Sequence, residues 1–242
     1  MVKSKEIIVI PAYNEEASLA SVIHNIKDHY HTADILVIND GSSDNTGTIA
    51  EQEADFTINL PYNSGYGIAL QTGFKYAYRN NYEYVISMDA DGQHDPRCIP
   101  QLLKELESGE YDLIIGSRFL GAEPFKMPFA KTVGLFFFRS AVLYCTNKKI
   151  TDPTSGYQAL NRRILKFYTT YFYPSDYPDA DLLIMIHLAG FKFKEIPVIM
   201  HPNPKVRGMH SGILVPLYYV FKMVLSIFTS LLRKKEAYEQ SE

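Results

Sequence analysis

The sequence has only two cysteines, no internal repeat and no low-complexity tract. Cys98 and Cys145 are too few for a disulfide scaffold or a thiolate metal site, and they suit a reducing cytoplasm. No signal peptide precedes the first apolar segment, so we expect a protein that is not exported. No run of lysine and arginine is interleaved with aromatic residues, which argues against nucleic acid as a partner.

The composition is that of a globular protein, since 46% of the 242 residues are hydrophobic and 21% are charged. This is enough apolar material for a sizeable core in one or two domains, taking about 150 residues per domain. Residues 1–115 carry 7 Lys and Arg against 18 Asp and Glu, whereas residues 116–242 carry 17 against 9. An acidic first half suits metal ions and a basic second half suits phosphates or an anionic membrane, unless both are solvated faces of one domain.

The first 120 residues alternate between strand patterns and helix patterns. Short β-branched runs predict strands at residues 6–10, 34–39, 56–60, 84–88 and 112–116. Apolar residues at helical spacing predict helices near residues 19–26, 44–54, 68–78 and 96–107. This order predicts an α/β fold with a mostly parallel central sheet and flanking helices. Because ligands bind beyond the carboxyl ends of such strands, one edge should hold the polar clusters at residues 13–16, 40–44 and 89–94.

The second half of the sequence is less regular. Its features are an apolar stretch at residues 125–144, a polar turn-rich stretch at 152–158, helical patterns at 164–171 and 182–188, and a last strand at 191–200. Residues 213–232 are apolar for about the length of a membrane span, but one polar stripe runs along them. With Arg233 and two lysines at its end, this segment resembles a helix lying in the membrane interface. A helix packed in the core or against a second copy in a homodimer, and a spanning helix, stay open as alternatives.

The strongest chemical signal is the motif DADGQH at residues 89–94. Asp89 and Asp91 leave a predicted strand one residue apart, so both carboxylates can reach one divalent cation, and Gln93 can add an amide oxygen. Mg²⁺ and Mn²⁺ prefer such hard oxygen ligands and commonly bridge to substrate phosphates. The motif therefore predicts a metal site, against the alternative of a simple turn cap.

Three further motifs follow the earlier strands. PAYNEE at residues 11–16 places a tyrosine, which can stack on a nucleobase, beside carboxylates, and NDGSSD at residues 39–44 ends the next strand. Taken alone, both also fit ordinary helix caps. NSGYGIAL at residues 63–70 resembles a dinucleotide loop, but Leu70 replaces its third glycine, which disfavours a dehydrogenase. The glycines more simply let a helix begin close to a nucleotide.

Taken in order, these motifs, with GSR at residues 116–118 and DPTSGY at residues 152–157, resemble glycosyltransferase family 2, closest to the polyprenol- and dolichyl-phosphate sugar synthases. The resemblance implies a GT-A fold, with residues 1–210 as the catalytic domain and residues 211–242 as an appended amphipathic helix. It also implies inverting transfer of a sugar from a UDP- or GDP-sugar, with Mg²⁺ or Mn²⁺ as the cofactor. Carried over by position, the residues that meet the nucleoside are Pro11, Tyr13, Glu15 and Asp40, and those that line the rest of the donor are Asn63, Gly67 and Ala90. The metal ligands are Asp89, Asp91 and Gln93. The residues that face phosphates are Arg118 and Arg207.

The acceptor decides which further group the reaction needs. A polyprenyl phosphate already carries a nucleophilic oxyanion, whereas a hydroxyl of a glycan needs a carboxylate base, for which Asp181 fits best and Asp179 second. The alternative for both is helix N-terminal charge. Lipid-phosphate members often carry a lysine shortly after the position of Arg207, where this chain has His210. We nevertheless expect a polyprenyl-phosphate acceptor.

The expected location is cytoplasmic, peripheral on the inner face of the cell membrane. Two rival functions remain at this point. A non-catalytic nucleotide-sugar-binding protein would keep the binding motifs without turnover, although the intact Asp89 and Asp91 pair argues against it. A nucleotidyltransferase would need a basic glycine-rich loop near the N-terminus, where residues 12–16 are acidic instead.

Overall fold

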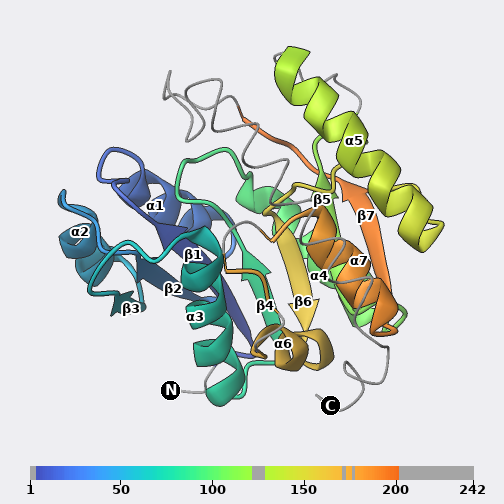
Figure 1. Cartoon of the computed structure of the whole chain (residues 1–242). Coiled ribbons are helices and arrows are strands. Elements are labelled where there is room, and N and C mark those ends of the chain that lie inside the picture. Colours follow the sequence, from blue (N-terminus) through green and yellow to red (C-terminus); the bar gives the residue numbers. More distant parts are fainter. Residues whose placement is uncertain (1–3, 122–128, 171–172, 176–177, 202–242) are drawn as a thin grey trace.

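The computed structural model describes residues 4–121, 129–170, 173–175 and 178–201. These residues form a seven-stranded sheet in the order β3-β2-β1-β4-β6-β5-β7 (Figure 1). The strands are β1 (Glu6–Ala12), β2 (Asp34–Asn39), β3 (Phe56–Asn59), β4 (Tyr84–Ser87), β5 (Leu113–Ser117), β6 (Gln158–Asn161) and β7 (Phe193–Pro197). Only β6 among the described strands runs antiparallel to its neighbours, so the expected mostly parallel sheet is confirmed.

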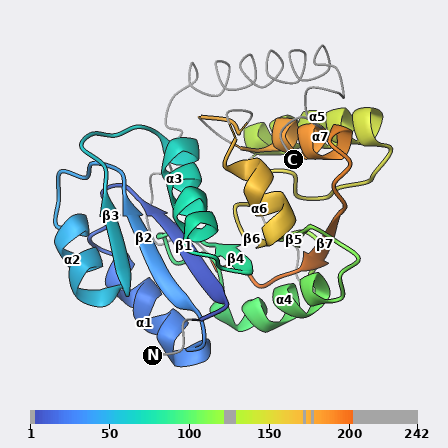
Figure 2. The ribbon, with the colours of Figure 1, turned by 90° about the horizontal axis from the view of Figure 1, so that it is seen from below.

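Helices cover both faces of this sheet, which gives three layers (Figure 2). The described helices are α1 (Leu19–His29), α2 (Thr46–Glu53), α3 (Tyr66–Arg79), a short 3-10 turn (Pro96–Cys98), α4 (Ile99–Glu107), α5 (Phe129–Thr146), α6 (Arg162–Tyr168) and α7 (Ala180–Leu188). Helices α1, α2 and α4 pack on one face, and α3, α6 and α7 on the other, with α5 against α7.

Strand β1 shows why its sequence is continuously apolar. Ile7 and Val9 contribute to the core under α3, whereas Ile8 and Ile10 contribute to the core under α1. All four side chains have no exposed surface. A parallel strand covered on both faces must be apolar at every position, because successive side chains point to opposite faces.

Strand β6 is the element that the sequence pattern did not predict. It has four residues and follows a polar stretch, and it enters the sheet between β4 and β5 with Ser87 opposite Gln158. Because β6 is antiparallel to β4, it begins where β4 ends. The segment 152–157 that leads into β6 therefore lies beside the segment that follows β4, at the carboxyl edge of the sheet.

The expected boundary at residue 210 and the expected C-terminal amphipathic helix lie outside the described residues. Strand β7 spans residues 193–197, which is shorter than the stretch of 191–200 that the sequence suggests. Within the described part of the chain, none of the helices combines the length and the apolar character that crossing a membrane requires.

Candidate active site

The loops that follow β1 and β2 are bonded to each other at the carboxyl edge of the sheet. The Asn14 N–H donates to the Ser42 hydroxyl at 3.0 Å, and the Glu15 N–H donates to the Thr46 hydroxyl at 2.8 Å. In return, the side-chain oxygen of Asn14 accepts the Ser43 N–H at 2.9 Å. The first two polar clusters are therefore one continuous surface, as expected from strand order.

Asp40 links this surface to the beginning of α3. The side chain is only 3% exposed, and its two oxygens accept the Ser64 N–H at 2.7 Å and the Gly65 N–H at 2.9 Å. Gly65 has φ +101°, a left-handed conformation that glycine adopts without strain. Asp40 thus fixes the loop at the N-terminus of α3, and lone pairs remain on both oxygens for a further donor.

The other residues expected to meet the donor lie around this edge. The Tyr13 ring is 46% exposed, and the Glu15 carboxylate accepts the Ser18 hydroxyl at 2.6 Å. The remaining four are divided between exposed and buried positions: Asn63 is exposed, whereas Pro11, Gly67 and Ala90 are buried.

Asp89 is held from two sides where it leaves β4. Its Oδ1 accepts the Tyr66 hydroxyl at 2.8 Å, and its Oδ2 lies 3.5 Å from His94 Nε2. Gly156 approaches the same carboxylate, since a Cβ at this position would lie 3.3 Å from Oδ1 and 2.6 Å from the Tyr66 hydroxyl oxygen. The third polar cluster therefore meets the α3 loop and the segment before β6, so all three clusters share one edge.

The residues expected to bind a metal offer a suitable but incomplete donor set. Asp91 Oδ1 accepts the Gln93 N–H at 3.0 Å, and the Gln93 side-chain amide lies 3.5 Å from the His201 carbonyl. No three His, Cys, Asp or Glu side chains cluster as a ready metal site anywhere in the described ranges. Two carboxylates and an amide fit a hard cation whose other ligands come from water and substrate phosphates, which is the usual arrangement for Mg²⁺.

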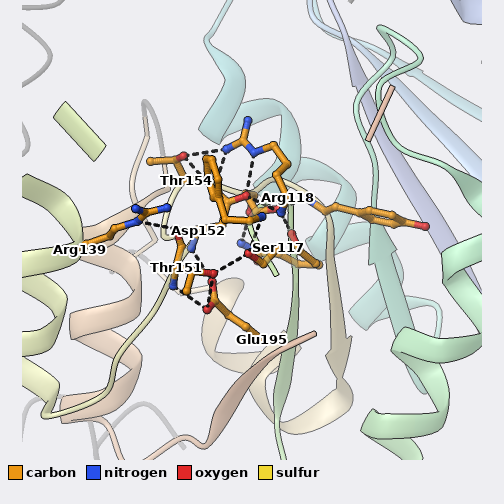
Figure 3. Close-up of polar contacts among 12 residues, drawn as sticks. Ser117, Arg118, Arg139, Thr151, Asp152, Thr154 and Glu195 are labelled. Atoms are coloured by element: carbon orange, nitrogen blue, oxygen red, sulfur yellow. Dashed lines mark hydrogen bonds and ion pairs between the residues drawn. The ribbon is translucent and has the colours of Figure 1, made fainter. Parts of the chain in front are cut away.

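Arg118 forms the basic side of the site (Figure 3). Its guanidinium donates from Nε and Nη2 to the two oxygens of Asp152, each at 2.7 Å, and from Nη2 to the Thr154 hydroxyl at 3.0 Å. The Asp152 side chain has no exposed surface, whereas Arg118 is 19% exposed. A buried carboxylate thus orients the arginine fork.

The two candidate bases at α7 differ in their surroundings. Asp181 is 3% exposed, and its Oδ1 accepts the Leu182 N–H at 2.8 Å and the Asp179 N–H at 3.3 Å, as a residue at a helix N-terminus does. Burial, with the negative charges of Asp181, Asp152 and Asp89, raises the pKa of Asp179 well above its ordinary value, against the opposing effect of Arg118. Electrostatically, Asp179 therefore belongs to the group that contains Asp89 and Arg118.

Arg207, expected to face a phosphate, and its neighbour His210 lie outside the described residues. No separate role is predicted from sequence for Tyr66, His94 or Asp152, all of which contact the expected site residues. Asp152 belongs to the DPTSGY motif, so the motif pointed to this residue, although it did not identify Arg118 as its partner.

The mostly parallel α/β sheet, with Asp89, Asp91 and Arg118 following strands at its carboxyl edge, has the architecture of the GT-A fold. The Glycosyl transferase family 2 model matches residues 7–169, and the chain belongs to that family. The expected enzyme class is therefore confirmed.

Relatives named for lipid-phosphate acceptors confirm the resemblance within the family. The chain is 29% identical over 238 residues to a UDP-N-acetylglucosamine–dolichyl-phosphate N-acetylglucosaminyltransferase of Methanococcus voltae, covering 90% of this chain and 94% of that protein. It is 30% identical over 169 residues to a polyprenol monophosphomannose synthase of Mycolicibacterium smegmatis, covering 67% of this chain and 63% of that protein. Glucosyl-3-phosphoglycerate synthase from Mycobacterium tuberculosis, solved with Mn²⁺, UDP and glucosyl-3-phosphoglycerate, has a TM-score of 0.66 at 20% identity, covering 96% of this chain and 79% of that chain. This last likeness shows the fold.

Proposed function

We propose that the protein transfers a sugar, with inversion, from a UDP- or GDP-sugar to a polyprenyl phosphate at the cytoplasmic face of the membrane. One observation carries the proposal: the segment 152–157, which orients Arg118 through Asp152, also approaches the Asp89 carboxylate through Gly156 at the same sheet edge. This edge offers acidic ligands for a cation and a basic fork for phosphate oxygens. The names of the two curated relatives support a lipid-phosphate acceptor.

In this proposal Asp89, Asp91 and Gln93 hold Mg²⁺ or Mn²⁺, which when bound supplies Lewis-acid stabilisation of the departing diphosphate. Tyr13 and Asp40 are proposed to meet the nucleoside, and Arg118 to add positive charge beside the phosphates. A phosphate acceptor brings its own oxyanion, so the chain does not need to remove a proton from it. Arg207 is proposed to face a phosphate as well.

A second candidate acceptor is a hydroxyl of a glycan precursor. The raised pKa of Asp179, caused first by burial and then by neighbouring carboxylates, is typical of a group that exchanges protons. In that reaction Asp179 or Asp181 would accept the hydroxyl proton. The two candidates differ in one testable respect, because only the hydroxyl reaction requires a base.

The test is release of UDP or GDP by the purified full chain from a panel of nucleotide sugars. Each reaction contains Mn²⁺ or Mg²⁺ and is run with and without a short-chain polyprenyl phosphate. Asp91→Asn should abolish release, whereas Asp28→Asn, the same change at an exposed position in α1, should leave it intact. Release that depends on the lipid and the metal supports the proposal.

If no lipid supports nucleotide release but a glycan acceptor does, the hydroxyl reaction would replace the proposal. Asp179→Asn and Asp181→Asn would then identify the base. Release without added metal, unaffected by EDTA, would overturn the metal role of Asp89 and Asp91.

A further inference from the structure

Glu195 in β7 binds two successive backbone N–H groups of the segment before β6. Its Oε2 accepts the Thr151 N–H and its Oε1 accepts the Asp152 N–H, both at 2.6 Å (Figure 3). Oε2 also accepts the Thr151 hydroxyl at 3.1 Å. Hydrogen bonds to an ionised acceptor are roughly twice as strong as neutral ones. The carboxylate is therefore a firm anchor for this short stretch of backbone.

The remaining polar groups of Thr151 are also engaged. Its carbonyl accepts Arg139 Nε at 2.6 Å, and its hydroxyl is 2.7 Å from the Ser117 hydroxyl (Figure 3). The Arg139 guanidinium lies over the Phe119 ring, 4.6 Å from its centroid. Elements β5, α5 and β7 thus converge on one residue, and the peptide that leads into Asp152 has its position set from three sides.

Asp152 transmits this position to the basic side of the site. Its carboxylate makes the two 2.7 Å bonds with Arg118, and its Oδ2 also accepts the Arg118 backbone N–H at 3.1 Å. The hydrogen bonds of Glu195 reach the backbone of Thr151 and Asp152, so its effect on the arginine passes through that backbone. Burial raises the pKa of Glu195 although the hydrogen bonds from Thr151 and Asp152 oppose the shift.

We propose that Glu195 is a positioning residue for sugar transfer, which fixes the direction of the Arg118 guanidinium by anchoring the backbone that presents Asp152. The inference rests on the proposed function, in which Arg118 meets phosphates. Glutamine is the informative replacement because it keeps the shape but offers only one acceptor oxygen, so one of the two backbone N–H groups would face an amide donor.

The test is a double-mutant cycle of Glu195→Gln with Arg118→Lys. Glu195→Gln alone should lower kcat/KM about 10- to 100-fold, the usual range for a residue that orients a ligand-contacting group. In the Arg118→Lys background, which lacks the bidentate fork, the same substitution should cost less than about 3-fold, because residues in one network are not additive. The affinity for UDP or GDP with Mn²⁺, measured calorimetrically on the same four proteins, should follow the same pattern.

Glu105→Gln is the matched control, since it removes the half-buried ion pair between Glu105 and Lys194, the neighbour of Glu195 in β7. It should leave kcat/KM unchanged. A purely structural role of Glu195 predicts a lowered Tm with equal fold losses in both backgrounds, and that additive result would overturn the inference. So would a Glu195→Gln variant with wild-type kinetics. If that variant does not fold, Glu195→Asp, which keeps two acceptor oxygens on a shorter arm, carries the same cycle.

Failure of the proposed function has a different signature. A wild type that releases no nucleotide from any donor contradicts the proposed function, and the nucleotide-affinity cycle then decides the role of Glu195. A wild type that binds no nucleotide at all overturns both. An active wild type with additive variants contradicts only the role of Glu195.

Discussion

His94 accepts the backbone N–H of Asp89 through Nδ1 at 3.0 Å and directs Nε2 towards the carboxylate of the same residue at 3.5 Å. Because Nδ1 acts as the acceptor, a neutral imidazole carries its proton on Nε2, facing Asp89. Burial lowers the pKa of His94, which favours that neutral form, and the ring is stacked on Tyr157 with centroids 4.7 Å apart. His94 therefore contacts both the backbone and the side chain of Asp89, an expected metal ligand, and helps to position it.

Replacement of His94 should weaken metal binding. His94→Leu removes both contacts with Asp89 and should lower the Mn²⁺ affinity about 10-fold, as loss of a group that orients a ligand commonly does. His94→Asn keeps an acceptor near the Nδ1 position and should lose less. Titration of free Mn²⁺ by electron paramagnetic resonance measures both. His31→Leu, at an exposed position, is the control, and equal affinities for all variants would contradict this role of His94.

A side chain at residue 156 should disturb the same carboxylate. Gly156→Ala would place its Cβ 2.6 Å from the Tyr66 hydroxyl oxygen and 3.3 Å from Asp89 Oδ1, so one of them must move. We expect Mn²⁺-dependent nucleotide affinity to fall about 10-fold, at a stability cost of about 1–3 kcal/mol. Calorimetry gives the affinity and urea unfolding gives the stability. Gly134→Ala in α5, where a Cβ meets no described atom within 4 Å, should leave nucleotide affinity unchanged.

The parts of the fold that were predictable are those with a local pattern. The strand at Glu6–Ala12 is apolar because it is covered on both faces, and the pair at Asp89 and Asp91 follows the end of a strand. Strand β6 has only four residues and begins with Gln158, so no window of sequence favours it. It is a strand because β4 and β5 pair with its backbone from both sides.

The contacts in the site that were not predicted from sequence also depend on how strands pair in the sheet. The partner of the Asp152 N–H is Glu195, 43 residues further along the chain, and Arg118 precedes Asp152 by 34 residues. Spacing alone does not pair such residues, because only the sheet order β6-β5-β7 places them together. The sequence favours Asp181 over Asp179 as a base, but the raised pKa of Asp179 comes from burial and from the negative charges of neighbouring carboxylates, and both depend on the fold.

The turn after β2 should tolerate no side chain at residue 41. Gly41 has φ +65°, and a Cβ there would lie 2.4 Å from the carbonyl carbon of Tyr62. Gly41→Ala should therefore lower the free energy of unfolding by about 3 kcal/mol, from backbone strain and overpacking together. Gly109→Ala is the matched comparison, since Gly109 has φ +76° and a Cβ there would meet no atom of the described residues within 4 Å, and it should cost about 1 kcal/mol. Equal losses in urea unfolding would show that the contact with Tyr62 is relieved elsewhere.

Asp95 should make the protein sensitive to acid. Hydrogen bonds from the Arg97 side chain, opposed by burial and supported by the Arg97 N–H and His201, lower the pKa of Asp95 to about 2. The pKa of an aspartate in an unfolded chain is about 3.9, so the folded state favours the ionised form of Asp95. This contribution to stability is fully present above that value and is lost as the pH falls towards about 2.

Asp95→Asn should therefore be less stable than the wild type at pH 6, and the difference that depends on pH should be on the order of 2 kcal/mol. The gap between the two proteins should narrow between pH 4 and the lowest pH at which both still fold, because the wild type loses the ionised carboxylate there. Urea unfolding at intervals of half a pH unit measures it, with Asp28→Asn as an exposed control that should follow the wild type in parallel. A constant gap between Asp95→Asn and the wild type from pH 6 to pH 2.5 would mean that the Arg97 pair does not shift the titration of Asp95.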